Sequence, residues 1–217
     1  MSIPPARPKI YHITHVENLR GIVSAGALFS DATIQKNKVL VKEVGMKKIK
    51  QRRLTLPVTC HEGTTVGEYV PFNFCPRSVM LYVIYSRANG DLDYLDGQDD
   101  IVHLEADLYD VVQWADQNRV PWALSLGNAG AYHTEFRCSL ESLDELDWKA
   151  ITAHDFRDPD VKERKQAEFL IKDAFPFALV ERIGVRTRQT FNRVQSLLSN
   201  IKNAKCPKVS IQWDWYF

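Results

Sequence analysis

One carboxylate in this sequence stands where its surroundings could tune its chemistry. Glu168 follows the polar stretch 163–166 and directly precedes the apolar residues 169–171. A short apolar run rich in aromatic and branched residues favours a buried strand over a long helix. At the mouth of such a strand, a carboxylate has a fixed position and a basicity set by burial and neighbouring charges. Glu168 is therefore a candidate catalytic acid, and a solvated glutamate at a strand end is the alternative.

A second candidate group is the histidine pair near the N-terminus. On the strand predicted at residues 9–14, His12 and His15 would face opposite sides, so they could not bind one metal together. His15, at a strand-to-helix junction, could instead help to hold a polar small molecule beside the free N–H groups of the following helix. The alternative is a histidine that caps this helix or packs in the core.

The charges are separated along the chain, although the net charge is only +1. Residues 36–53 carry eight lysines and arginines against the single acid Glu43, whereas residues 91–116 carry nine acids. A local basic segment on a nearly neutral protein indicates a polyanionic partner that binds one face. A solvated lysine-rich loop is the alternative.

Several classes of protein are disfavoured by the motifs that the chain lacks. It has no Walker A sequence, no G-x-G-x-x-G after a strand and no G-x-S-x-G elbow. Its four cysteines are widely spaced, without a C-x-x-C pair, which argues against a zinc ribbon and a disulfide framework. No N-terminal apolar region and no apolar span of about 18 residues occurs. We therefore expect a cytoplasmic protein with no metal and no membrane contact.

Short strands and short helices alternate irregularly, which predicts a compact α+β domain over residues 1–217 with an extended lead-in at 1–9. Residues 39–41 are expected as a strand or buried turn, and 42–53 as a cationic helix. The aromatic C-terminus, 213–217, is expected to close a core. Apolar spacing predicts the other main helices at 17–25, 107–115, 160–166 and 188–200, and strands at 70–74, 101–104, 122–124, 183–185 and 209–211.

Six segments, in this order, resemble the DarT family of bacterial toxins, which ADP-ribosylate single-stranded DNA with NAD. They are YHITHVENL from residue 11, RRLTLPV from 52, EYVPFNFCP from 68, SLDELDWKAITAHDFRDPD from 142, ERKQAEFLI from 163, and the terminal WYF. The similarity covers nearly the whole chain. It implies an ADP-ribosyltransferase fold with two packed, mainly antiparallel sheets, flanking helices and an NAD cleft.

The resemblance also implies roles for particular residues. Glu168 matches the catalytic glutamate of the family, and Arg53 matches a catalytic arginine that also contacts NAD. Further NAD contacts are implied at Ile13, Thr14, His15, Gly21 and Leu28. The basic segment fits a DNA-tracking element, with Lys47, Lys48 and Lys50 as DNA contacts. The loop at 127–136 matches a DNA-facing loop of the family and makes Tyr132 and His133 further DNA-binding candidates.

Physical chemistry agrees with these roles. Positive charge develops on the ribose as nicotinamide leaves, and a carboxylate hydrogen-bonded to the ribose 2′-OH would stabilise it. Arg53 is a poor general base because a guanidinium keeps its proton, so Glu168 is the better acceptor for the proton of the attacking base. The expected enzyme is a pentosyl-transferring glycosyltransferase that uses NAD as co-substrate, acts as a monomer and has a macrodomain antitoxin of DarG type.

Three alternatives remain open at this point. The target base is expected to be thymine, but guanine is the alternative because base choice depends on loops. A non-catalytic module could bind NAD or nucleic acid in the same cleft. A metal-independent nuclease could use arginine, histidine and glutamate to cleave nucleic acid without NAD.

Overall fold

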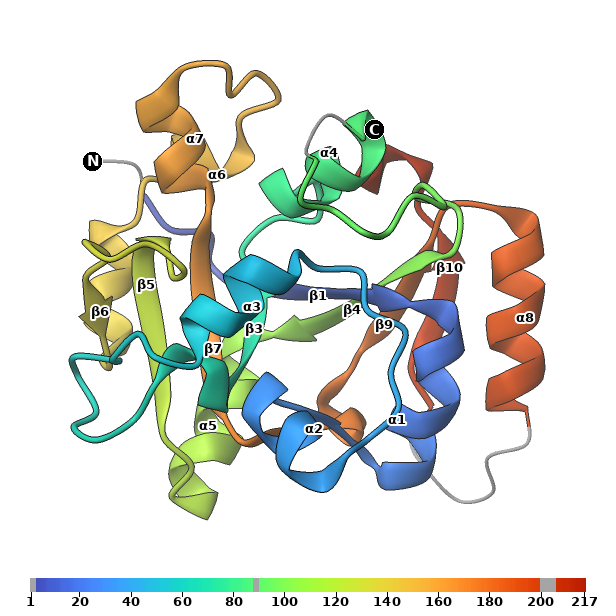
Figure 1. Cartoon of the computed structure of the whole chain (residues 1–217), viewed down its shortest axis with the longest axis horizontal. Helices are drawn as coiled ribbons and strands as arrows, with labels where there is room; N and C mark the ends of the chain where they lie inside the picture. The colour runs from blue at the N-terminus through green and yellow to red at the C-terminus, as the bar shows by residue number, and fades with distance from the viewer. Residues whose placement is uncertain (1–2, 88–89, 200–205) are drawn as a thin grey trace.

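The computed structural model of this chain describes residues 3–87, 90–199 and 206–217. Their strands form one large sheet and one small sheet (Figure 1). In spatial order the large sheet contains β10 (Lys208–Ile211), β9 (Arg182–Val185), β4 (Ile101–Asp107), β1 (Lys9–His15), β3 (Tyr69–Asn73), β7 (Ala167–Lys172), β5 (Trp122–Asn128) and β6 (Phe136–Arg137). Only the β10–β9 pair is parallel among the strand pairs of the described residues. The small sheet pairs β2 (Ala27–Phe29) with β8 (Ala174–Pro176).

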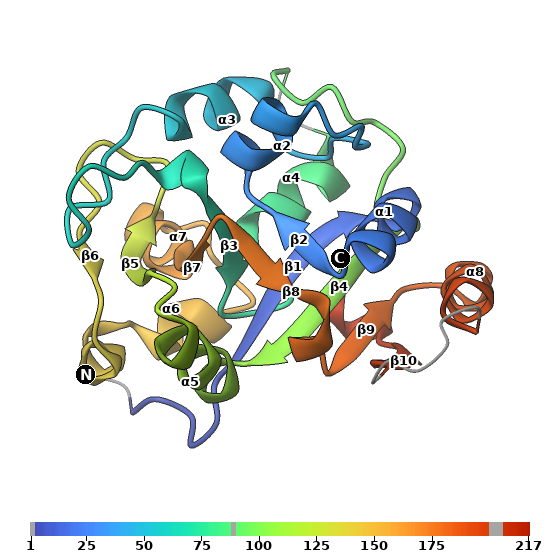
Figure 2. The ribbon, with the colours of Figure 1, turned by 90° about the horizontal axis from the view of Figure 1, so that it is seen from below.

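Eight α-helices flank the sheets within the part of the chain that the structure describes. They are α1 (Leu19–Ala25), α2 (Asp31–Asn37), α3 (Lys47–Arg53), α4 (Val79–Ser86), α5 (Leu108–Asn118), α6 (Trp148–Thr152), α7 (Pro159–Lys165) and α8 (Arg188–Leu198). Short 3₁₀ turns are η1 (Val16–Asn18), η2 (Val66–Glu68), η3 (Leu140–Glu145), η4 (Phe177–Leu179) and η5 (Trp213–Trp215). Helices α2 and α3 lie on one side of the large sheet and α5 on the other (Figure 2). The α+β class predicted from the sequence is confirmed, with two sheets of unequal size.

Strand β7 lies between β3 and β5 in the large sheet, and residues 167–171 are all buried. Because side chains alternate along a strand, Ala167, Phe169 and Ile171 enter the main core. Leu170 enters a smaller core formed with residues of the loop that follows α3, including Leu56 and Val58. Glu168 shares the face of Leu170, so the period of the strand places its carboxylate on the side where α3 packs.

The junction before β7 is fixed from several directions. Asp158 caps α7 by accepting hydrogen bonds from two backbone N–H groups, and Pro159 occupies the first turn. At the end of the helix, the buried side chain of Lys165 donates from Nζ to the carbonyl of Ile151 in α6 (2.6 Å). The chain is therefore anchored at Lys165, two residues before β7 begins and three residues before Glu168.

Two expectations about apolar segments had different outcomes. The prediction that 213–217 closes a core is confirmed for Trp215 and Tyr216, which are buried in a third core, but not for Trp213, which is 77 % exposed. A Cβ at Gly184 would lie only 2.3 Å from the Trp215 ring. The strand or buried turn predicted at 39–41 is wrong, because Leu40 is 98 % exposed and the segment has no regular structure. Lys38 ends α2 in a left-handed conformation, and the segment then runs along a cavity.

Helix α8 ends at Leu198, and residue 200, where the sequence placed its end, lies outside the described residues. Within the described ranges, no helix combines the length and the apolar character needed to cross a bilayer.

Candidate active site

Glu168 is held by backbone contacts on both sides of β7. It lies opposite Asn73 in the register with β3, and its N–H donates to Ser125 Oγ in β5 (2.9 Å). Ser125 in turn donates to the carbonyl of Gly127 (2.7 Å). A carboxylate on a central strand with this support has little freedom to move, which is what a preorganised catalytic group requires.

Arg53, the last residue of α3, forms a bidentate ion pair with Glu168. Its Nη1 and Nη2 lie 3.0 and 2.9 Å from the two carboxylate oxygens, and each side chain is only 11 % exposed. Burial alone would lower the pKa of Arg53, but the adjacent Glu168 carboxylate outweighs it, so the pKa is raised. The guanidinium therefore holds its proton firmly and is a poor proton acceptor. The structure thus joins the two candidates for catalysis into one unit.

A cavity of about 490 Å³ opens beside this pair. Its volume falls in the range of small-molecule and cofactor sites, roughly 300–1,000 Å³. Arg53 and Glu168 form part of its wall, together with residues of β1, α1, β2, α2, α3 and α4 and the whole of 39–46. Residues 39–41 line this space and belong to none of the apolar cores formed by the described residues.

Most of the predicted NAD contacts line the cavity. The set that the structure brings together with Arg53 and Glu168 is Ile13, Thr14, Gly21 and Leu28. Leu28 is buried, and Gly21 is exposed on α1. The first strand, the first helix and the small sheet therefore converge on one space, although they are separated in sequence from Glu168.

His15 is placed differently from these residues. It is fully buried and is not part of the cavity wall; its Nδ1 accepts a hydrogen bond from the N–H of Glu17 (3.2 Å) and caps η1. Burial lowers its pKa. Its Nε2 is buried with no hydrogen-bond partner among the described residues. His15 thus has the capping role that the sequence left open, next in sequence to Thr14 of the cavity wall.

The side chain of Asn18 holds the segment 38–46 in place beside the cavity. Its Oδ1 accepts from the N–H of Lys42 (2.7 Å), and its Nδ2 donates to the carbonyl of Lys42 (2.9 Å). Nδ2 also lies 3.1 Å from Thr14 Oγ1. One amide side chain therefore connects β1, η1 and the segment that forms the outer wall of the cavity.

The family resemblance implies that this cavity holds NAD, so replacing Asn18 with alanine should raise the KM for NAD while changing kcat much less. The variant loses both hydrogen bonds to Lys42, each worth about 1 kcal/mol, so we expect a rise of roughly 10- to 30-fold. Steady-state kinetics with varied NAD measures this split. The matched control is Asn118→Ala. Among the described residues, the side chain of Asn118 hydrogen-bonds only to the carbonyl of Trp114. An unchanged KM in Asn18→Ala would show that this closure does not support NAD binding.

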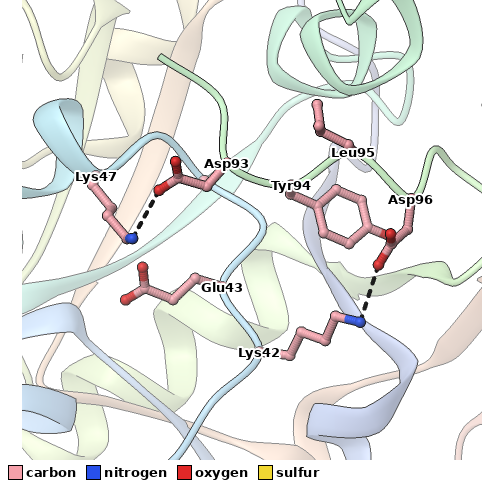
Figure 3. Close-up of a pocket in the computed structure, with 8 residues that line it drawn as sticks. Lys42, Glu43, Lys47, Asp93, Tyr94, Leu95 and Asp96 are labelled. Carbon is pink, nitrogen blue, oxygen red and sulfur yellow. Dashed lines mark hydrogen bonds and ion pairs between the residues drawn. The ribbon is translucent and has the colours of Figure 1, made fainter. Parts of the chain in front are cut away.

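The basic and acidic stretches of the sequence meet beside the cavity. Lys47 lies 2.8 Å from Asp93, and Lys42 lies 3.1 Å from Asp96, as Figure 3 shows. Lys48 pairs with Asp91 in the same loop. The side chains of Lys47 and Lys48 remain 68 % and 78 % exposed. Exposed pairs of this kind contribute at most about 1 kcal/mol, so a polyanion can replace the acidic loop.

Lys50 does not face outward with the other two predicted DNA contacts. Its side chain is 24 % exposed, lines the cavity and lies 3.0 Å from Asp31 of α2. Lys50 and Arg53 lie three residues apart and share the inner face of α3, whereas Lys48 lies on its outer face.

Tyr132 and His133 lie at the tip of the loop between β5 and β6, and both are about 80 % exposed. The guanidinium of Arg52 lies over the Tyr132 ring at 5.7 Å. A Cβ at Gly130 would come within 3.4 Å of the Ile49 side chain, so the loop packs directly on α3. The two predicted DNA-binding elements therefore adjoin each other and the cavity.

Comparison with known proteins decides the family. The family model described as ssDNA thymidine ADP-ribosyltransferase, DarT, matches residues 11–217. The chain belongs to the DarT family. A DNA ADP-ribosyl transferase of Thermus sp. (strain 2.9) is 37 % identical over 214 residues, which are 98 % of each protein. The family inferred from the sequence is confirmed, and this DarT-family chain is a DNA ADP-ribosyltransferase.

Two solved structures support the same conclusion for the fold. Thermus sp. 2.9 DarT in complex with ADP-ribosylated ssDNA superposes with a TM-score of 0.90 at 36 % identity, covering 100 % of this chain and 99 % of that one. Thermus sp. 2.9 DarT in complex with NAD⁺ gives a TM-score of 0.80 at 35 % identity, with coverage of 99 % and 100 %.

Some residues of this DarT-family site were not found from the sequence. Asn18 and Asn73 line the cavity, and Asn18 also closes it, but isolated asparagines carry no motif. Ser125, which positions Glu168, lies in an apolar strand, where a single hydroxyl was a usable signal. Val39 and Leu40 are exposed apolar residues beside the cavity, a feature that often marks a ligand site but that only the structure reveals.

Proposed function

We propose that this chain transfers the ADP-ribosyl group of NAD to a thymine of single-stranded DNA and releases nicotinamide. The observation that carries this proposal is the buried Arg53–Glu168 pair in the wall of a cavity of about 490 Å³. The lining suits a dinucleotide, since Lys42, Lys50 and Arg53 offer positive charge to a diphosphate. Apolar side chains such as Leu28 offer contacts to the flat rings.

In this proposal Glu168 stabilises the positive charge that develops on the ribose. Each carboxylate oxygen has two lone pairs, so the two hydrogen bonds from Arg53 leave capacity for a ribose 2′-OH. Because Arg53 and the β7 backbone already fix the carboxylate, little reorganisation is required when charge develops. This interaction is stronger in the transition state than in the bound substrate, which is the condition for a rate increase.

Glu168 and Arg53 have different roles in the proton transfer. The thymine nitrogen that attacks the ribose must lose a proton, and Glu168 is the acceptor within the pair. Arg53 keeps its proton and stabilises negative charge on the base or on a phosphate as that proton leaves. These two side chains supply the charges for the transfer, and the proposal requires no metal for it.

A single assay tests the proposal against its alternatives. Labelled NAD is incubated with the protein and with single-stranded oligonucleotides that contain or lack thymine. Label should enter only the thymine-containing strand, with one nicotinamide released for each ADP-ribose transferred. Label on a thymine-free, guanine-containing strand would move the target to guanine. Binding without transfer would support a non-catalytic module, and shortened DNA without NAD would support a nuclease.

The exposed lysines of α3 should govern DNA affinity through charge. In Lys47→Gln/Lys48→Gln, single-stranded DNA should bind more weakly, and the dependence of log Kd on log salt should fall by about 0.7 for each phosphate that is no longer neutralised. Asp93→Asn should have the opposite effect and tighten binding, because Asp93 competes for Lys47. Fluorescence anisotropy at several salt concentrations measures both. If the lysine variant keeps the wild-type salt slope, these lysines do not bind the strand.

The biological setting follows from the proposed activity. We propose that the chain is a toxin and that it acts in the cytoplasm, where NAD and single-stranded DNA both occur. We further propose that it acts as a monomer. The family resemblance adds a macrodomain antitoxin of DarG type, which would remove ADP-ribose from the DNA. Co-expression with such a macrodomain should restore growth of cells that carry the active chain.

A further inference from the structure

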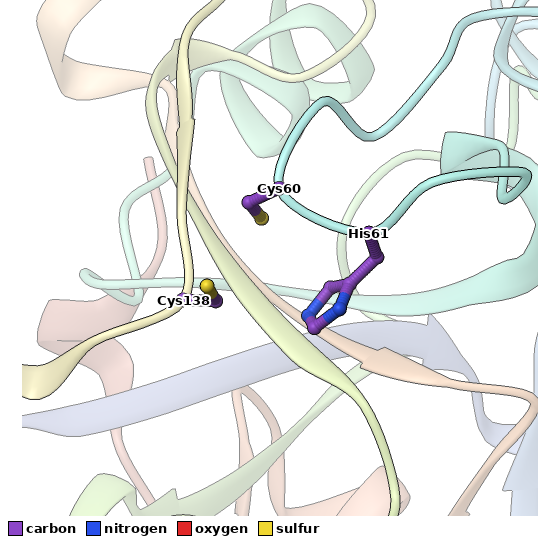
Figure 4. Close-up of side chains that lie close together, drawn as sticks. All are labelled: Cys60, His61 and Cys138. Atoms are coloured by element: carbon purple, nitrogen blue, oxygen red, sulfur yellow. The ribbon is translucent and has the colours of Figure 1, made fainter.

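Three soft metal-binding side chains converge at a site away from the cavity. Cys60 and His61 lie in the loop between α3 and η2, and Cys138 directly follows β6. One ligand atom of each residue lies within 4.8 Å of those of the other two. Figure 4 shows the three side chains directed toward one shared space. None of the three residues belongs to the wall of the cavity that holds Arg53 and Glu168.

The separation of these atoms is close to that required by a tetrahedral metal site. Zinc binds cysteine sulfur at about 2.3 Å and histidine nitrogen at about 2.0 Å, which places ligand atoms roughly 3.5 to 3.8 Å apart. The three ligand atoms lie within 4.8 Å of one another, so small side-chain rotations are enough to bring them to these separations. Two cysteines and one histidine are a donor set that selects thiophilic cations over Mg²⁺ or Ca²⁺.

The surroundings hold the three side chains in place. His61 Nε2 donates to the main-chain carbonyl of Trp122 in β5 (2.8 Å), which holds the imidazole beside the two thiols. Cys60 also packs against the smaller core that contains Leu170.

We propose that Cys60, His61 and Cys138 bind one thiophilic divalent cation of the Zn²⁺ class, with water as the fourth ligand. Binding releases two protons, one from each thiol, and the imidazole stays neutral with its single proton on the nitrogen that does not bind the ion. The ion would connect the loop that follows α3 to the end of β6. It therefore stabilises the fold beside the active site and takes no part in the transfer reaction.

Metal titration of the full chain tests this site. The reduced protein, freed of metal, is titrated with Zn²⁺, and with Co²⁺ as a spectroscopic probe of thiolate ligands. We expect one ion per chain by native mass spectrometry, a thiolate-to-cobalt absorption band and a higher Tm with Zn²⁺. Cys60→Ser, Cys138→Ser and His61→Ala should each weaken binding by at least about 100-fold, because even indirect partners of metal ligands are worth 10- to 100-fold.

Two matched variants make the outcome specific. Cys206 is an exposed free cysteine outside the cluster, so Cys206→Ser should bind the ion as the wild type does. Glu168→Gln should also bind normally, which separates this site from the reaction. The proposal is overturned if the chain takes up no Zn²⁺, if Cys60→Ser and Cys138→Ser bind it like the wild type, or if Cys60 and Cys138 form a disulfide in place of metal uptake.

Discussion

Replacing Glu168 with glutamine should reduce ADP-ribosyl transfer to DNA by at least about 10²- to 10³-fold, the typical effect of removing one group that stabilises developing charge. Glutamine keeps the shape of the side chain and can accept one hydrogen bond from Arg53, but it cannot stabilise a positive ribose or accept the proton of the base. The loss should appear in kcat, because the interaction is made mainly in the transition state. Transfer of label from NAD to a thymine-containing strand measures it.

The variant also removes the counterion of Arg53, so the effect on chemistry must be separated from an effect on folding. Far-UV circular dichroism, Tm and NAD affinity should be measured with the same preparation. Glu141→Gln, which changes an exposed glutamate on η3, is the matched control and should retain full activity. A folded Glu168→Gln protein that binds NAD and transfers label at the wild-type rate would exclude Glu168 from catalysis.

Replacing Arg53 with alanine should damage both stability and activity. Glu168, which is 8 % exposed in the wild type, would lose its only ion-pair partner among the described residues. Removing one member of a buried pair costs about 3–5 kcal/mol, which corresponds to a fall in Tm on the order of 10 °C for a domain of this size. Thermal unfolding followed by circular dichroism measures the change, with transfer activity assayed well below the lowered Tm.

Arg53→Lys separates the charge of the side chain from its shape. Lysine restores a positive charge near Glu168 but cannot form two parallel hydrogen bonds, so much of the stability should return while transfer stays at least about 10-fold below the wild type. Arg188→Lys, at an exposed position on α8, controls for the substitution itself. Full activity in Arg53→Lys would show that only the charge is required.

The parts of the site that lie close together in sequence were predictable. The run after Glu168 predicted a buried strand, and the fold class followed from short irregular elements; both are observed. The match of Arg53 and Glu168 to the family also placed two residues far apart in sequence, which the structure joins at 2.9 Å. Periodicity alone could not have paired them, because it contains no information on which helix packs over which strand.

Interactions that depend on packing between distant loops were not predictable. No pattern in the chain indicated that the acids at 91–96 would lie against the lysines of α3. The same holds for Cys60 and Cys138, whose spacing matches no metal motif and whose proximity depends on the pairing of β6 with β5. His15 shows a different limit, because a histidine at this junction suits both a ligand contact and a helix cap. The hydrogen bond from the N–H of Glu17 identifies the cap, and the sequence does not predict it.

The ion pairs between α3 and the acidic loop have a consequence for which acceptors the enzyme can use. The carboxylate of Asp91 pairs with Lys48, and that of Asp93 pairs with Lys47. A free mononucleotide has too few well-spaced charges to replace both carboxylates. A chain of several nucleotides supplies one phosphate per residue and can displace them together. If Lys47 and Lys48 bind the strand as proposed, discrimination by acceptor length is built into the surface, so that monomeric nucleotides escape modification while single strands of several nucleotides are modified.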